Sequence, residues 1–330
     1  MIMKANPSVK YEIIREMSSR DNNLLNVKWL CDIAGVSRSG YYYWLSTEKD
    51  RINRELQDEV DFKLILEAYK YRGYNKGVRG IHMRLLHQDP PVVMNPKKIR
   101  RLMRKFNLQC PIRKPNPYRR IAKAMQTSRV APNLLNREFR ASGARSVLLT
   151  DITYIPRRNF GTSGNQLYSY VSVIMDAYTK QVLACVVSSS ITVDFVLETV
   201  KQLMDNYGHE LKTDALIHSD QGCHYTSSKF IEIISNANLR QSMSRRANCW
   251  DNAPQESLFG HMKSEVHFKP SANHADIARK VLDWIDYYNN DRYQWALAKL
   301  SPNEYYDYIT SGNYPLGELF NKNLIEKYIP

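Results

Sequence analysis

Apolar residues recur at helical spacing in the first 45 residues, and short polar runs interrupt the pattern. Val9, Ile13 and Met17 mark one face of a predicted helix, which ends at the run 21–23. A second apolar helix over 27–34 stops at Gly35, and the residue two positions later, a serine, is a favoured first cap of a following helix.

Two helices joined at a glycine are the pattern of a helix-turn-helix motif. In such a motif the second helix enters the major groove of DNA, so we expect Arg38, Ser39 and Tyr42 to face bases or phosphates. A plain helical hairpin explains the same residues equally well.

Residues 52–109 continue the helical pattern with more positive charge. A charged amphipathic helix is predicted over 52–71, then a loop with three glycines and a short helix over 81–86. The helix 96–106 has one apolar face and is otherwise cationic, so this part resembles a second helix-turn-helix motif. The residues of this unit that we expect to contact DNA are Arg72, Lys76, Arg79, Lys97, Lys98, Arg100, Arg101, Arg104 and Lys105.

The stretch 110–145 places four prolines among many lysines and arginines, which indicates an extended basic linker. Its expected DNA contacts are Arg113, Lys114, Arg119 and Arg120.

The second half of the chain changes from helical spacing to short β-branched and aromatic runs. Three such runs in succession, followed by alternating helices and strands, indicate a mixed α/β sheet. Strands are predicted over 146–155, 167–175, 181–188, 215–218 and 239–243, and helices over 192–207, 226–237 and 252–267.

Composition narrows the class of protein. The chain is 43% hydrophobic and 24% charged, as expected of a globular protein, and has no apolar run near the roughly 20 residues of a membrane span. The N-terminus has no signal-peptide pattern, and the five cysteines are scattered without a Cys-x-x-Cys pair. We therefore expect a reduced cytoplasmic protein without a disulfide framework or a zinc ribbon.

Positive charge is concentrated in the N-terminal 145 residues. Residues 1–145 carry 30 Lys and Arg against 13 Asp and Glu, a net charge of +17, whereas residues 146–330 carry 17 against 20, a net charge of −3. This asymmetry is typical of nucleic-acid binding, although a solvated basic face is the alternative for any single charge run.

Three carboxylates stand where a sheet would bring them to one edge. Asp151 interrupts an apolar strand, Asp220 follows the fourth strand, and Glu256 opens a helix. Crowded carboxylates favour a hard divalent cation, and two ions about 3.5–4 Å apart catalyse in-line displacement at phosphorus. From position alone, an ion pair for Asp151 and a favourable helix-dipole contact for Glu256 explain these acids as well.

The motifs around these acids resemble a known family. Asp220 and Glu256 are separated by 35 residues, and with Asp151 upstream the pattern is similar to the DDE transposases that share a retroviral-integrase-like core. The surroundings resemble the bacterial insertion-sequence family whose transposase is made by frameshifting, here as its second reading frame product. The matching stretches are Thr150-Asp151-Ile152-Thr153-Tyr154, His218-Ser219-Asp220-Gln221-Gly222, Trp250-Asp251-Asn252-Ala253, Glu256-Ser257 with Lys263, and Ser301-Pro302.

The resemblance implies an α/β RNase H-like catalytic core with a mixed five-stranded sheet, preceded by all-α helix-turn-helix domains. The expected domains are 1–55 and 56–109 for the two helix-turn-helix units, 110–145 for the linker, 146–270 for the core and 271–330 for a C-terminal helical extension.

The resemblance also implies the chemistry. Asp151, Asp220 and Glu256 would hold two Mg²⁺ ions, with Mn²⁺ as a substitute, for strand cleavage and strand transfer. Lys263, two helical turns after Glu256, would place its ammonium on the phosphate. His218 and Asn252 would orient the ligands, and Arg245 and Arg246 would contact DNA.

The implied partners are double-stranded DNA, both terminal inverted repeats and target, a second copy of the chain or a higher oligomer, and the first reading frame product. The implied location is the bacterial nucleoid. Two alternatives remain: a DNA-binding regulator that has lost catalysis, and a structure-selective or RNase H-type nuclease.

Overall fold

The computed structural model describes residues 6–111, 143–157, 167–244, 253–268 and 273–319. The chain divides into two compact units, Met1–Leu64 and Ile65–Pro330. None of the helices in these described ranges has the length and apolar character needed to cross a membrane.

The N-terminal unit contains the predicted helix-turn-helix. Its helices are α1 (Pro7–Ser18), α2 (Val27–Ala34) and α3 (Arg38–Ser46). Gly35 ends α2 in the left-handed region at φ 63°, and the hydroxyl of Ser37 caps α3 by accepting a hydrogen bond from the Gly40 amide. Ile14, Leu30 and Tyr41 bring the three helices around one small core.

The long helix α4 (Glu48–Lys70) begins four residues before the predicted start. The domain boundary expected between residues 55 and 56 therefore lies inside a continuous helix, because neither glycine nor proline interrupts the sequence from 48 to 70. A 3₁₀ turn, Tyr71–Gly73, ends this stretch.

The helices α5 (Val78–Leu86) and α6 (Pro96–Lys105) pack together through buried apolar residues. Asn95 caps α6 by accepting from the Lys97 amide, and Pro96 occupies the first turn, where its missing N–H costs nothing. The predicted basic helix is thus confirmed as a helix.

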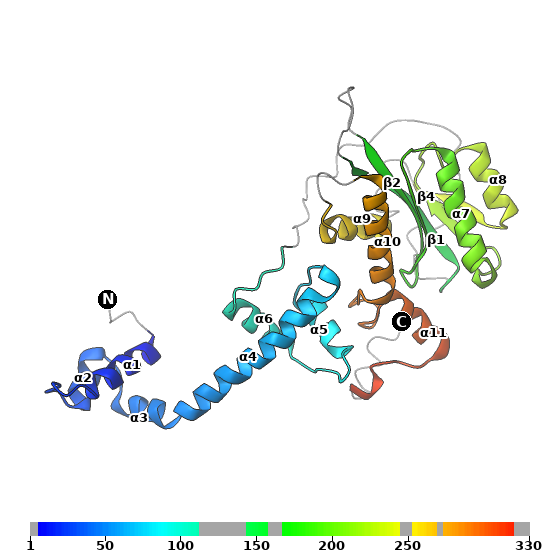
Figure 1. The fold of residues 1–330 in the computed structure, drawn as a ribbon. Helices are drawn as coiled ribbons and strands as arrows, with labels where there is room; N and C mark the ends of the chain where they lie inside the picture. Colours follow the sequence, from blue (N-terminus) through cyan, green and yellow to red (C-terminus); the bar gives the residue numbers. More distant parts are fainter. Residues whose placement is uncertain (1–5, 112–142, 158–166, 245–252, 269–272, 320–330) are drawn as a thin grey trace. The chain divides into compact units, whose positions relative to one another are not determined.

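A five-stranded sheet forms the centre of the second unit, with the order β3-β2-β1-β4-β5 (Figure 1). β1, β2 and β3 are antiparallel neighbours, while β4 pairs with β1, and β5 with β4, in parallel. The predicted mixed five-stranded sheet is confirmed. The strands are β1 (Val147–Pro156), β2 (Tyr168–Asp176), β3 (Val182–Ser188), β4 (Leu216–Ser219) and β5 (Arg240–Met243).

Helices cover both faces of this sheet, because alternate residues of β1 supply apolar side chains to each side. Leu148 faces α7 (Val193–Tyr207) and α8 (Ser228–Asn236), whereas Leu149 faces α9 (Ala253–Glu265) and α10 (His274–Asn290). Figure 1 shows α9 and α10 on one side of the sheet and α7 and α8 on the other.

Helix α10, which lies in the C-terminal helical extension expected over 271–330, packs against the sheet. Ile277, Val281 and Trp284 of α10 are fully buried in the same cluster as Leu149. Two elements follow α10: the helix α11 (Pro302–Ser311), which is capped by Ser301, and the 3₁₀ turn Gly317–Leu319. A further 3₁₀ turn, Gly208–Glu210, follows α7.

Candidate functional site

Asp151 lies within β1, and Asp220 directly follows the end of the neighbouring parallel strand β4. Leu149 of β1 pairs with His218 of β4, so each aspartate stands two residues further along in the same direction. Side chains two residues apart on a strand share a face of the sheet, which places Asp151 on the same side as Leu149, the side covered by α9 and α10.

The negative charges of Asp151 and Asp220 both act on the buried Tyr225 side chain. Its hydroxyl lies 3.5 Å from the Thr150 hydroxyl. Burial raises the pKa of Tyr225 well above its ordinary value, and the carboxylates of both Asp151 and Asp220 raise it further.

The backbone helps to fix both aspartates. The Asp151 carboxylate accepts from the Ile152 amide at 2.8 Å, and Asp220 accepts from the Gly222 amide at 2.9 Å. A Cβ atom on residue 222 would lie 2.9 Å from the Asp220 carboxylate, so the loop after β4 needs a glycine at this position.

Helix α9 carries Glu256 and Lys263 along the same side of the sheet. Gln255 joins the start of α9 to the strands: its amide nitrogen donates to the carbonyl oxygen of Leu149 at 2.7 Å. Near the end of α9, the Lys263 ammonium lies 5.1 Å from the centre of the Tyr154 ring. Both predicted residues are exposed, Glu256 in the first turn and Lys263 two turns later.

Carboxylates such as those of Asp151, Asp220 and Glu256 are ligands that magnesium prefers, but these side chains are not gathered into a metal-binding group in this structure. Within the described ranges, no three His, Cys, Asp or Glu side chains are near enough to one another to hold an ion together. Asp151, Asp220 and Glu256 therefore do not form such a three-ligand group in this structure.

Of the two residues predicted to orient the metal ligands, His218 and Asn252, the structure describes only His218. His218 is fully buried, and its Nδ1 lies 2.9 Å from the Ser242 hydroxyl, which links β4 to β5. Asn252 lies outside the described residues, as do Arg113, Lys114, Arg119, Arg120, Arg245 and Arg246.

Asp176 accepts hydrogen bonds from the backbone amide and hydroxyl of Thr179, so it caps the β2–β3 turn.

In the first helix-turn-helix, Arg38, Ser39 and Tyr42 are exposed on α3 while the neighbouring Tyr41 is buried. The exposed face of this helix therefore includes the three residues predicted to read DNA, together with Tyr43.

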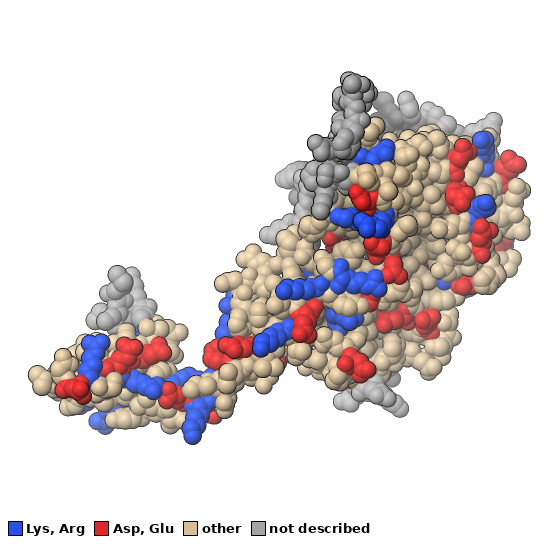
Figure 2. Space-filling view, in the orientation of Figure 1, with Lys and Arg blue, Asp and Glu red and all other residues tan. Residues whose placement is uncertain are grey.

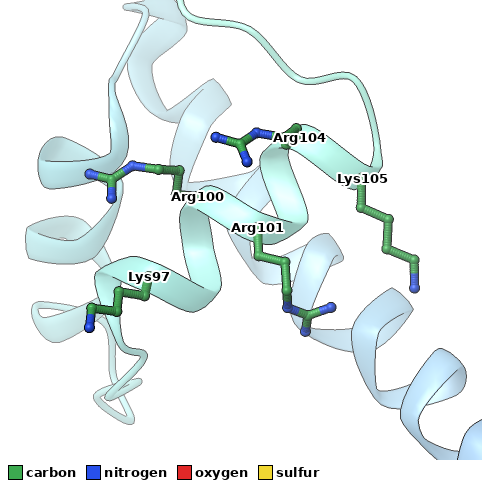
Figure 3. A pocket seen from close by; sticks show the side chains of 5 residues that line it. All are labelled: Lys97, Arg100, Arg101, Arg104 and Lys105. Atoms are coloured by element: carbon green, nitrogen blue, oxygen red, sulfur yellow. The ribbon is translucent and has the colours of Figure 1, made fainter.

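The basic side chains of α6 surround a hollow of about 380 Å³ (Figure 3). Lys97, Arg100 and Arg104 extend to one side of the helix, and Arg101 and Lys105 extend to the other. Ile99, Leu102 and Met103 are buried on the opposite face, whereas Lys98 is half-buried. On the face shown in Figure 2, Lys and Arg are interspersed with Asp and Glu, whereas the sequence of α6 contains several basic residues and no acidic one.

Lys76 requires a correction, because the structure buries a residue that we expected to contact DNA. It is 6% exposed, and its ammonium donates to the carbonyl oxygens of Tyr71 and Tyr74. A DNA phosphate cannot reach this ammonium without opening the fold.

Arg72 and Arg79 contact α10 and the segment that follows it. Arg72 forms ion pairs with Asp286 at 2.6 Å and Asp291 at 2.8 Å, so two carboxylates already neutralise its charge. Arg79 is exposed, with its guanidinium 5.5 Å from the centre of the Trp295 ring.

Gln255 and Tyr225 are two site residues that the sequence reasoning missed. Gln255 begins a stripe whose later members, Leu258, Phe259 and Met262, are all apolar and buried. A polar residue at the first position of a buried stripe is a usable signal for a specific buried hydrogen bond.

Comparison with known proteins agrees with this architecture. Residues 55–116 match an HTH-like domain, and residues 141–249 and 237–302 match two integrase core domain models. The catalytic core of HTLV-2 integrase covers 49% of this chain and 97% of its own length at 12% identity, with a TM-score of only 0.37.

The sequence relatives are proteins of bacterial insertion sequences. The InsK protein of element IS150 from Escherichia coli (strain K12) is 30% identical over 275 residues, 82% of this chain and 90% of InsK. Transposase InsF of IS3A, from the same organism, is 26% identical over 284 residues, 85% of this chain and 93% of InsF. The chain therefore belongs to the insertion-sequence transposases, with an HTH-like domain followed by an integrase core.

Proposed function

We propose that this chain cleaves and joins the ends of an insertion sequence through Asp151, Asp220 and Glu256. The observation that supports the proposal is that Asp151 lies on β1, two residues after Leu149, while Asp220 lies two residues after His218, the partner of Leu149 on the parallel strand β4. The helix that bears Glu256 is attached to β1 only two residues from Asp151.

The three carboxylates would together bind Mg²⁺, or Mn²⁺ in its place. When bound, the metal supplies Lewis-acid stabilisation of the charge that develops on the attacking and leaving oxygens. The oxygen-only donor set fits a hard cation, and closure of the three-ligand group would need Glu256 to approach the two aspartates.

Two phosphoryl transfers follow from one such site. Water attacks the phosphorus at the end of the element, a P–O bond forms as the bond to the 3′ oxygen breaks, and a 3′-hydroxyl is released. That hydroxyl then attacks the phosphorus of a second phosphodiester: a new P–O bond forms as the bond to that strand's own 3′ oxygen breaks, and the departing oxygen takes up a proton. Lys263, exposed two turns after Glu256, would place its ammonium beside the reacting phosphate.

The helix-turn-helix units would supply end recognition. α3 presents Arg38, Ser39 and Tyr42, and α6 presents Lys97, Arg100 and Arg104 around its hollow. Two DNA ends must be held for joining, so we expect a homodimer or higher oligomer on DNA, with the first reading frame product as a further partner.

The test uses the full chain, Mg²⁺ and a duplex that ends in the inverted repeat flanking its gene. We expect Asp151→Asn, Asp220→Asn and Glu256→Gln to lose about two orders of magnitude or more in cleavage rate and to retain DNA binding. Glu232→Gln, on the exposed surface of α8, is the matched control and should cleave normally. Wild-type cleavage rates in all three variants would overturn the assignment.

A DNA-binding regulator without catalysis is the second candidate. It predicts that the wild-type chain binds the repeat but releases no 3′-hydroxyl with either Mg²⁺ or Mn²⁺. The intact set of acids, together with Lys263, favours the active enzyme.

A further inference from the structure

Gln255 is a polar residue in an otherwise apolar contact between α9 and the sheet. Its side chain has no exposed surface, and the residues three, four and seven positions later are Leu258, Phe259 and Met262. A buried amide in this position needs hydrogen-bond partners, because loss of its hydration is otherwise uncompensated.

The amide nitrogen of Gln255 has such partners in two backbone carbonyls near Asp151, one on β1 and one on β2. The Gln255 amide nitrogen donates to the Leu149 carbonyl at 2.7 Å, and it lies 3.3 Å from the carbonyl of Val173. Leu149 precedes Asp151 by two residues on β1, and Val173 is the residue of β2 paired directly with Asp151. One amide therefore holds the two strands at the position of the aspartate.

Glu256 is the next residue of the chain after this anchor. A shift or rotation of the first turn of α9 would move Glu256 by a similar amount, whereas the far end of the helix is held separately. There, Glu265 accepts hydrogen bonds from Arg292 and from the Trp284 indole. The anchor at Gln255 thus controls the end of α9 that carries the proposed ligand.

We infer that Gln255 is a positioning residue, whose amide sets the place of Glu256 relative to Asp151 and thereby the affinity of the acidic site for divalent metal. This inference rests on the proposed function, since it takes Glu256 to be a metal ligand. Gln255 itself does not touch the metal or the DNA.

The test measures Mn²⁺ binding to the DNA-free full chain by isothermal titration calorimetry, independently of activity. Gln255→Met keeps the length of the side chain and the apolar stripe but removes the N–H donors. Outer residues that orient metal ligands typically contribute 10–100-fold to affinity, so we expect a loss of about tenfold or more. The Mg²⁺ concentration for half-maximal cleavage should rise in parallel.

Asn289→Leu is the matched control for a purely structural effect. The Asn289 amide similarly bridges strand backbone, since it accepts from the Val182 amide at 2.9 Å and donates to the Val182 carbonyl at 2.8 Å. It lies on α10 and does not hold α9. We expect this variant to melt at a lower temperature than wild type with unchanged Mn²⁺ affinity.

Glu256→Gln separates failure of the inference from failure of the proposed function. If Glu256→Gln weakens Mn²⁺ binding and Gln255→Met does not, the positioning role is wrong and the proposed function stands. If Glu256→Gln binds Mn²⁺ as wild type does, both are wrong. Should Gln255→Met fail to fold, Gln255→Asn decides: wild-type Mn²⁺ affinity in this shortened variant overturns the inference, and a measurable loss supports it.

Discussion

Glu265 and Arg292 form a two-pronged ion pair that is almost entirely removed from water. The Arg292 guanidinium donates from Nη2 at 2.9 Å and from Nε at 3.1 Å, and the two side chains are 6% and 16% exposed. Burial alone would lower the pKa of the arginine, but the charge and hydrogen bonds of Glu265 raise it above its ordinary value, so the guanidinium stays ionised. This pair joins the end of α9 to the segment after α10.

Removal of one partner should be far more harmful than removal of both charges. Arg292→Met would leave the Glu265 carboxylate buried without its counter-charge, which typically costs about 3–5 kcal/mol. The double variant Glu265→Gln with Arg292→Met should recover a substantial part of that loss. Urea unfolding of the three proteins gives the free energies, and equal losses in the single and double variants would contradict the argument.

Lys76 gives the stability a distinct dependence on pH. Burial lowers the pKa of its ammonium from 10.5 to about 8. Between pH 8 and pH 10.5 the unfolded chain therefore binds a proton at this residue that the folded chain does not. Stability rises with pH wherever the unfolded state binds more protons, so the Lys76 contribution should increase across this range.

The measurement is the unfolding free energy of wild type minus that of Lys76→Met, taken at several pH values. Buried tyrosines such as Tyr287 titrate in both proteins, so their effects cancel in the difference. We expect the difference to grow in favour of wild type from pH 8 to 10.5. A flat or falling difference would show that the ammonium is well solvated.

The sheet could be predicted from the sequence, whereas the burial of Lys76 could not. Alternation along β1, with Leu148 facing one helix pair and Leu149 the other, is a local pattern that places strands without knowledge of the rest. Lys76 lies in a glycine-containing loop that resembles a solvent-exposed segment. The ring of Tyr287, 5.4 Å from its ammonium, comes from more than 200 residues away.

In the C-terminal helices and the candidate site, too, local patterns are predictable from the sequence whereas tertiary contacts are not. The spacing of Ile277, Val281 and Trp284 indicates an apolar face on α10, but no local signal names the sheet as its partner. Asp151, Asp220 and Glu256 were identifiable by their motifs. The anchoring of α9 at Leu149 depends on tertiary contact and became visible only in the structure.

DNA binding should lose salt dependence when α6 loses charge. Each phosphate that a basic side chain neutralises contributes about 0.9 to the slope of log affinity against log salt. Lys97→Ala, Arg100→Ala and Arg104→Ala should each lower the slope by up to about this amount, as measured by fluorescence anisotropy between low and moderate salt. Arg279→Ala, exposed on α10, is the control and should leave the slope unchanged.

Gly40 should resist a substitution that normally stabilises helices. Alanine in a helix interior is favoured over glycine by about 1 kcal/mol, but a Cβ atom here would lie 2.4 Å from the Tyr11 hydroxyl and 2.7 Å from the capping hydroxyl of Ser37. Tyr11 has little freedom to move, because its ring packs against two others: the ring centroids are 6.1 Å apart for Tyr11 and Tyr41 and 6.0 Å apart for Tyr11 and Trp44.

We therefore expect Gly40→Ala to destabilise the N-terminal unit by about 1–3 kcal/mol through overpacking. Hydrogen exchange of amides in α1 to α3 measures this locally, without interference from the larger unit. Ser39→Ala, an exposed change on the same helix, supplies the control and should leave protection equal or slightly higher. Increased protection in Gly40→Ala would contradict this prediction, because it would mean that Tyr11 moves aside at little cost. The contact between Tyr11 and α3 would then not hold in place the helix that we propose reads DNA.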